Sequence, residues 1–203
     1  MDYTPLQIEQ TLSIRRLYSL HYFQFAAGYI FPGETHNFWE MVYIDRGEAD
    51  IGAGKDMFRL CQGQAFFHKP NEFHSIWANS ATGPNIMVLS FACASPALRM
   101  LAGQPQTLTS QTRGLLRQLI AEGRMCFGPV LDISGQRTLT PRGDAPLGSQ
   151  QMIALLLTQI LLLMLRQARG GQEPPRLTAP HLTEEQNATD LTNQLTQLMR
   201  EHL

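Results

Sequence analysis

Residues 33–47 read Gly33-Glu34-Thr35-His36-Asn37-Phe38-Trp39-Glu40-Met41-Val42-Tyr43-Ile44-Asp45-Arg46-Gly47. Aromatic and β-branched side chains fill its second half, which predicts a β-strand. Side chains at even spacing share one face of a strand, so the pattern places Glu34, His36 and Glu40 together. The apolar side chains expected on that same face are Phe38, Val42 and Ile44. Ionisable groups on an otherwise apolar face indicate a site rather than a core.

A second stretch with histidines and aromatic residues is Gly63-Gln64-Ala65-Phe66-Phe67-His68-Lys69-Pro70-Asn71-Glu72-Phe73-His74. His68 and His74 flank a turn predicted at Pro70-Asn71. The apolar residues around them continue to Ile76 and Trp77. The sequence therefore contains two polar clusters, each set among strand-like apolar residues.

Together the two segments resemble the paired motifs of the cupin β-barrel superfamily. The first family motif has an acidic residue or His, a His, a Glu four residues later and a Gly seven later, matched here by Glu34, His36, Glu40 and Gly47. The second runs from a Gly through a Pro turn to a His, matched by Gly63, Pro70 and His74. The family's glycine after that proline is replaced by Asn71 or Glu72, so the second match is looser.

The resemblance narrows to the sensor domain of AraC-type transcription regulators. The run from Phe38 to Ile44 followed by Gly47-Glu48 is similar to that domain, as is the turn Pro70-Asn71-Glu72-Phe73-His74-Ser75. Residues 91–100 and 115–127 also fit its pattern. The resemblance implies a barrel that holds an organic effector, generally without metal, in a dimeric regulator that binds DNA through helix-turn-helix units.

Composition limits the partners that this chain can bind by itself. It has 203 residues, a formal net charge of −1 and no cluster of Lys and Arg, so we expect no DNA binding by this part alone. Three widely spaced cysteines argue against a disulfide framework and favour a reducing, cytoplasmic location. The N-terminus does not resemble a signal peptide. The most apolar run, Met152 to Leu165, is too short to span a bilayer and predicts a buried helix, so no membrane partner is expected.

The chain divides into segments of different character. Short strand-like pieces fill residues 1–95, the predicted barrel. Helices are expected at 111–127, capped by Thr109 or Ser110, and at 149–168, within a helical dimerisation region spanning 96–169. A proline-containing linker follows at 170–187, and residues 188–203 resemble the start of the first helix of a truncated helix-turn-helix domain. The predicted fold class is mainly β plus α: a cupin-like, jelly-roll β-barrel followed by two or three α-helices.

The helix at 149–168 is apolar nearly all the way round, so it needs cover on more than one side. The barrel is expected to cover one side and the same helix of a second subunit the other. Trp39, Met41 and Tyr43 alternate with the polar residues of their strand. They should therefore face out of the barrel and pack under the helices.

Three readings of the polar residues stay open. In the first they orient a small-molecule effector between apolar walls; the expected ligand-binding residues are Glu34, His36, Phe38, Glu40, His74 and Trp77. In the second, His36, Glu40 and His74 hold Fe, Mn, Ni or Zn, although no metal or other cofactor is expected. In the third they form a satisfied polar network without a ligand.

The favoured function is that of the effector-sensing and dimerisation part of an AraC-type regulator, which is not an enzyme. The rival is a small cupin metalloenzyme, an isomerase or dioxygenase, using His36, Glu40 and His74. The long helical region after the barrel and the missing second His of the first motif count against the rival. The sequence leaves the identity of the effector open.

Overall fold

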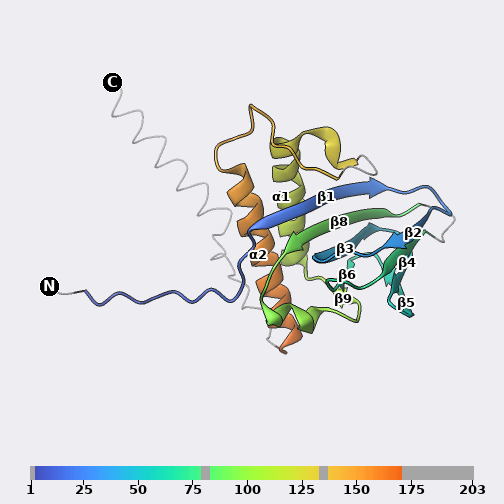
Figure 1. Cartoon of the computed structure of the whole chain (residues 1–203), viewed down its shortest axis with the longest axis horizontal. Helices are drawn as coiled ribbons and strands as arrows, with labels where there is room; N and C mark the ends of the chain where they lie inside the picture. Colours follow the sequence, from blue (N-terminus) through green and yellow to red (C-terminus); the bar gives the residue numbers. More distant parts are fainter. Residues whose placement is uncertain (1–2, 79–82, 133–136, 171–203) are drawn as a thin grey trace, which may run out of the picture. The chain divides into compact units, whose positions relative to one another are not determined.

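The computed structural model describes residues 3–78, 83–132 and 137–170 (Figure 1). Its strands are β1 (Arg16–Gln24), β2 (Ile30–Glu34), β3 (Trp39–Arg46), β4 (Glu48–Ala53), β5 (Asp56–Cys61), β6 (Gln64–His68), β7 (His74–Trp77), β8 (Asn85–Ala92) and β9 (Gln106–Thr107). Its helices are α1 (Ser110–Phe127) and α2 (Ser149–Ala168), with 3₁₀ turns η1 (Pro96–Leu101) and η2 (Pro129–Asp132). Residues 3–15 contain no helix or strand, although short strand-like pieces were predicted throughout residues 1–95.

The strands form two antiparallel sheets. One has the order β1-β8-β3-β6-β9 and the other β2-β7-β4-β5. Between them lies an apolar core in which every residue is buried; it comprises Val42, Ile44, Ala49, Ile51, Ala53, Leu60, Phe66, Ile76, Ile86 and Val88. This arrangement confirms the predicted fold class, a cupin-like β structure followed by helices.

Strand β3 separates the two cores of the molecule. Val42 and Ile44 point into the space between the sheets. Trp39, Met41 and Tyr43 point the other way and pack in a second core with the helices. The prediction that these three side chains lie under the C-terminal helices is confirmed. A displacement of β3 would therefore move side chains in both cores.

Helix α1 approaches the five-stranded sheet closely because Gly123 faces β1. The Thr109 side chain caps the helix by accepting a hydrogen bond from the Thr112 backbone N–H. A Cβ placed on Gly123 would lie 2.4 Å from Leu20 Cδ2, so only glycine fits there without a shift. Both helices lie against the outer face of this sheet (Figure 1).

Helix α2 has one buried side and one exposed apolar stripe. The buried side includes Ile153, Leu157 and Ile160, whereas Met152 and Leu155 are exposed. It has the predicted 20 residues, and by length and composition alone it could cross a membrane, although its most apolar run, Met152 to Leu165, was expected to be too short to do so. Its contacts with the second core also give it the character of a core helix.

Residues 3–78, 83–132 and 137–170 belong to one compact unit. The predicted boundary between residues 95 and 96 therefore separates regions of different secondary structure inside that unit. Nearly all of the predicted linker at 170–187, and all of the helix predicted at 188–203, lie outside the described residues.

Candidate functional site

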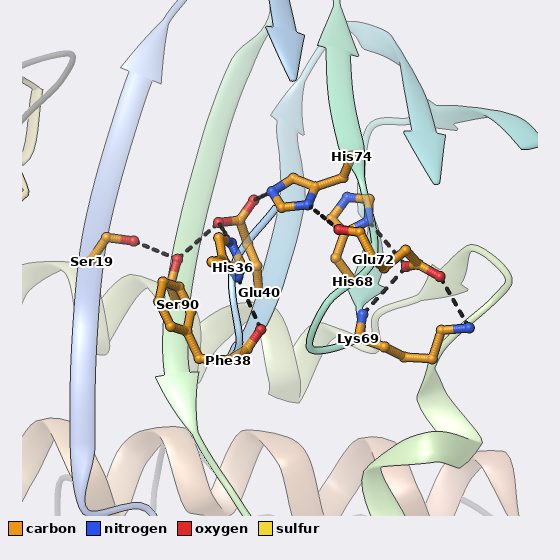
Figure 2. Close-up of polar contacts among 9 residues, drawn as sticks. All are labelled: Ser19, His36, Phe38, Glu40, His68, Lys69, Glu72, His74 and Ser90. Atoms are coloured by element: carbon orange, nitrogen blue, oxygen red, sulfur yellow. Dashed lines mark hydrogen bonds and ion pairs between the residues drawn. The ribbon is translucent and has the colours of Figure 1, made fainter. Parts of the chain in front are cut away.

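Four ionisable side chains converge between the two sheets. The nearest ligand atoms of Glu34, His36, Glu40 and His74 all lie within 4.8 Å of one another. Figure 2 shows His36, Glu40 and His74 pointing toward one another from separate segments. The structure thus brings together three residues of the first sequence motif and His74 of the second.

The route by which three of them meet differs from the prediction. Residues 33–47 do not form one strand: β2 ends at Glu34, His36 lies in the connection, and β3 begins at Trp39. Strands β2 and β3 belong to different sheets. The three side chains converge because the connection crosses between the sheets. Glu34 also pairs with His74 across the β2–β7 ladder.

Both histidines are oriented by hydrogen bonds to backbone carbonyls. His36 Nδ1 donates to Phe38 O at 3.1 Å, and His74 Nδ1 donates to Glu72 O at 3.0 Å. Each bond leaves Nε2 facing Glu40: His36 Nε2 lies 3.3 Å from Oε2, and His74 Nε2 lies 3.4 Å from Oε1. Hydrogen bonding at one ring nitrogen fixes which nitrogen is presented to a ligand.

Glu40 is almost fully buried and ionised. Its Oε2 accepts a hydrogen bond of 2.9 Å from Ser90 Oγ, which lies 2.6 Å from Ser19 Oγ. Burial acts to raise the pKa of Glu40, but the hydrogen bond from His36, the charges of the neighbouring histidines and Ser90 hold it below its usual value.

His36 carries the complementary shift. Burial acts to lower the pKa of His36, but the hydrogen bond and charge of Glu40, together with the charge of Glu34, raise it above its ordinary value. A protonated His36 can donate from Nε2 to Glu40 while Nδ1 donates to Phe38. In that protonated form the pair is a charge-assisted contact, which is the stronger class of hydrogen bond.

His68 extends the cluster from β6. It lies opposite Glu40 in the β3–β6 ladder, is fully buried and stacks on His74 with ring centroids 4.5 Å apart. Burial, and then the charge of His74, lower the pKa of His68 to about 4. Neither of its ring nitrogens makes a hydrogen bond within the described part of the chain, although Nδ1 lies 3.6 Å from Glu72 Oε2.

Two of the predicted wall residues behave differently. Phe38 stacks on His36 with a centroid distance of 3.8 Å and on Tyr18 at 3.9 Å, so it lies beside the cluster as expected. The prediction that Trp77 lines the same interior is wrong, because its side chain is 45% exposed. Trp77 lies three residues after His74 on β7, and odd spacing places a side chain on the opposite face.

The donor set suits a divalent transition metal as well as a polar ligand. Two imidazole nitrogens and two carboxylate oxygens all lie within 4.8 Å of one another. His74 Nε2 is buried and makes no hydrogen bond to any described residue. Imidazole with carboxylate is a combination found around Fe, Mn, Ni and Zn. The residues therefore fit such an ion.

Residues 16–124 match the family model for the AraC-like ligand binding domain. The match covers more than half of the chain and contains all four converging residues. The chain belongs to this family. No curated protein matches it.

Solved structures show a partial likeness to this member of the AraC-like ligand-binding family. A conserved protein of unknown function from Streptococcus pyogenes is 18% identical, with a TM-score of 0.31, over 33% of this chain and 57% of that one. An oxalate decarboxylase from Bacillus subtilis has the same identity and score, over 33% and 19%. A cupin superfamily protein from Desulfitobacterium hafniense is 20% identical, with a TM-score of 0.31, over 36% and 63%. The matched regions thus span less than two thirds of each of these chains.

Sequence reasoning missed the residues that support the cluster from distant strands. Ser19 and Ser90 come from β1 and β8, and they are brought beside Glu40 by ladders between segments far apart in the chain. Glu72 follows the turn after His68 and accepts a hydrogen bond from the Lys69 backbone N–H. The available signal for Ser90 was a lone polar residue within the apolar strand at 86–91.

Proposed function

We propose that this chain is the effector-sensing and dimerisation part of an AraC-type transcription regulator, and that it is not an enzyme. Membership of the ligand-binding family supports the sensing role. The observation that carries the proposal is the cluster of buried Glu40 and His74 with half-buried His36 between apolar sheets. Polar groups converging in an apolar surrounding are what a small-molecule site requires.

The proposed effector is small and polar, and His36, Glu40 and His74 orient it. Glu40 accepts hydrogen bonds, while the two Nε2 atoms donate when protonated and accept when neutral. Glu34 and Phe38 complete the proposed contact set, with Phe38 as an aromatic wall against His36. The ligand would take up hydrogen-bonding capacity that is free at His74 Nε2 among the described residues.

Strand β3 gives this site a direct route to the helices. Glu40 faces the site, while its neighbours Trp39 and Met41 are buried in the core shared with α1 and α2. An effector that binds one arrangement of β3 more tightly would shift the population of the helical arrangement. The proposed output is a change in how attached DNA-binding helices are spaced.

Dimerisation through α2 is part of the same proposal. Met152 and Leu155 form an exposed apolar stripe one helical turn apart. DNA would be contacted only through a C-terminal helix-turn-helix domain, and the proposed location is the cytoplasm. Paired readers match paired half-sites, which is why a dimer suits such a regulator.

The direct test is effector-dependent DNA binding by a regulator that contains this domain. The effector should change DNA affinity for the unaltered protein, and His74→Gln should abolish the response while leaving basal DNA binding intact. A control variant, Gln118→Glu on the exposed side of α1, should keep the response. DNA affinity that ignores every ligand bound by the domain would refute the proposal.

A second candidate, a small cupin metalloenzyme of the isomerase or dioxygenase type, is favoured by the two rings anchored to backbone carbonyls and by the buried His74 Nε2, which makes no hydrogen bond to any described residue. In it, His36, Glu40 and His74 would hold the metal, which would supply Lewis-acid or redox chemistry. Mass spectrometric metal analysis of dialysed protein separates the two functions. Stoichiometric metal together with turnover would favour the enzyme.

A further inference from the structure

A cavity lies outside the polar cluster, where the start of β1 meets the start of α2. It has a volume of about 410 Å³ and is also lined by Leu139 and Pro141, which precede α2. Its apolar lining consists mainly of Ile14, Leu17, Phe127, Leu139, Ile153 and Leu157. A cavity of this size and composition is large enough for a small organic molecule.

Two basic residues are among those that line this cavity. Arg15 and Arg16 both line it, and none of its lining residues is acidic. Neither guanidinium forms an ion pair with a described carboxylate; Arg15 Nε donates a hydrogen bond of 3.3 Å to Ser13 Oγ. Guanidinium groups match planar carboxylates better than any other side chain does.

The beginning of α2 adds to the positive potential. Gln150, in the first turn of this helix, lines the cavity. The N-cap residue is Gly148, with φ 78°, and it offers no side chain to the first-turn N–H groups. The N-terminus of a 20-residue helix favours a nearby anion, and here it acts together with two arginines and a formed cavity.

We propose that this cavity binds an amphipathic carboxylate, a small molecule with an apolar body and one anionic head. The apolar body occupies the space between Leu17, Leu139 and Leu157. The head lies at the rim, against Arg15, Arg16 and the first turn of α2. This site is separate from the His36–Glu40–His74 cluster and does not depend on the function proposed for it.

A row of stacked rings connects the lining of this cavity with that cluster. Tyr18 contributes to its wall and lies in the register shift of β1 between Leu17 and Ser19. The Tyr18 ring stacks on Phe38, which stacks on His36. A carboxylate bound here would hold β1, Tyr18 and α2 together beside the barrel site.

Calorimetric titration of the 203-residue protein with decanoate, below its micelle concentration, tests the proposal. Decanol and decyltrimethylammonium serve as neutral and cationic probes of the same chain length. The double variant Arg15→Gln/Arg16→Gln tests the head, and Ala154→Phe fills the cavity from α2. The controls are Arg166→Gln, near the other end of α2, and His74→Gln in the barrel. A thermal melt of each variant verifies that it folds.

Decanoate should bind once per chain and more tightly than the other two probes. The double variant should weaken decanoate by about tenfold, as expected for charge-assisted contacts, and leave decanol unchanged. Ala154→Phe should abolish binding of both, and the two controls should bind normally. Absence of decanoate binding, equal binding by the double variant, or loss of binding in His74→Gln would each overturn the assignment.

Discussion

Glu40 is the residue that connects the buried histidines. Its two oxygens face His36 Nε2 and His74 Nε2, and Ser90 Oγ donates to it. The buried carboxylate therefore has three polar partners. Its loss would deprive His36 Nε2 of its hydrogen-bond partner and His74 Nε2 of the carboxylate beside it. Unpaired buried polar groups are costly.

Glu40→Gln should therefore lower the stability of chelator-treated protein by about 1–3 kcal/mol near pH 6. The lowered pKa of Glu40 gives stability that is present above its ordinary value of 4.5 and lost as the pH falls through the folded pKa. The raised pKa of His36 gives stability that is present below 6.5 and lost as the pH rises through the folded pKa. The difference from wild type should be largest between those two values in urea denaturation. A difference that does not vary with pH would contradict the pairing.

The pKa of His68 is shifted in the opposite direction from that of His36, so its effect on stability is also opposite. Its pKa of about 4 lies below the ordinary 6.5, so the unfolded chain takes up a proton that the folded chain refuses. Wild-type protein should lose about 2 kcal/mol through this group between pH 7.5 and pH 5. His68→Leu should remove that loss, as measured by urea denaturation at both pH values. An equal decline in the variant would show that His68 titrates normally.

At the scale of elements, the sequence predicts helices and central strands well because their signals are local. Thr109 caps α1 as expected, and α2 spans the predicted 149–168. The arrangement of residues 33–47 was not predicted correctly, because strand periodicity does not reveal that Glu34 and Glu40 belong to different sheets. Ser19 and Ser90 join the site through long-range pairing, which no local pattern encodes. The sequence placed His68 near His74, but its position opposite Glu40 depends on the β3–β6 ladder. The outward position of Trp77 follows from its odd spacing from His74.

The packing of α1 on β1 yields a prediction with an internal control. Gly123→Ala should destabilise the protein by about 1–3 kcal/mol, because a Cβ there would meet the fully buried Leu20 side chain. Gly114→Ala, on the same helix, would approach only the end of the Arg117 side chain, at 3.9 Å. It should stabilise the helix by up to about 1 kcal/mol. Equal effects of the two substitutions in thermal or urea unfolding would contradict the close approach at Gly123.

At the scale of the whole molecule, β3 and α2 connect the proposed ligand site with the proposed dimer interface, because their side chains pack in the same core. The barrel site and the helices share β3, since Glu40 faces one core and Met41 the other. The exposed stripe on α2 lies on the far side of the same helical layer. A sensor requires this continuity, because a ligand shifts an equilibrium only through contacts that differ between two states.

The dimer proposal is tested by mass in solution. The Leu155 side chain is 55% exposed and is proposed to pack against the same helix of the second subunit. Glutamate at this position should prevent that packing, because burying an unpaired charge in an apolar interface is costly. Leu155→Glu should therefore give a monomer by light scattering at a concentration where the unaltered chain is a dimer. Gln118→Glu, with the same charge change on α1, should stay dimeric. A monomeric wild-type chain, or a dimeric Leu155→Glu variant, would contradict an interface on α2.

The central claim is that His36, Glu40 and His74 bind a small polar effector. The most direct measurement is a thermal-shift screen of sugars, organic acids and aromatic metabolites against metal-free wild type and His74→Gln. Binding raises the melting temperature by mass action. The account predicts a compound that stabilises wild type and leaves the melting temperature of His74→Gln unchanged. Equal stabilisation of both proteins by every binder would contradict it, because the ligand would then lie elsewhere.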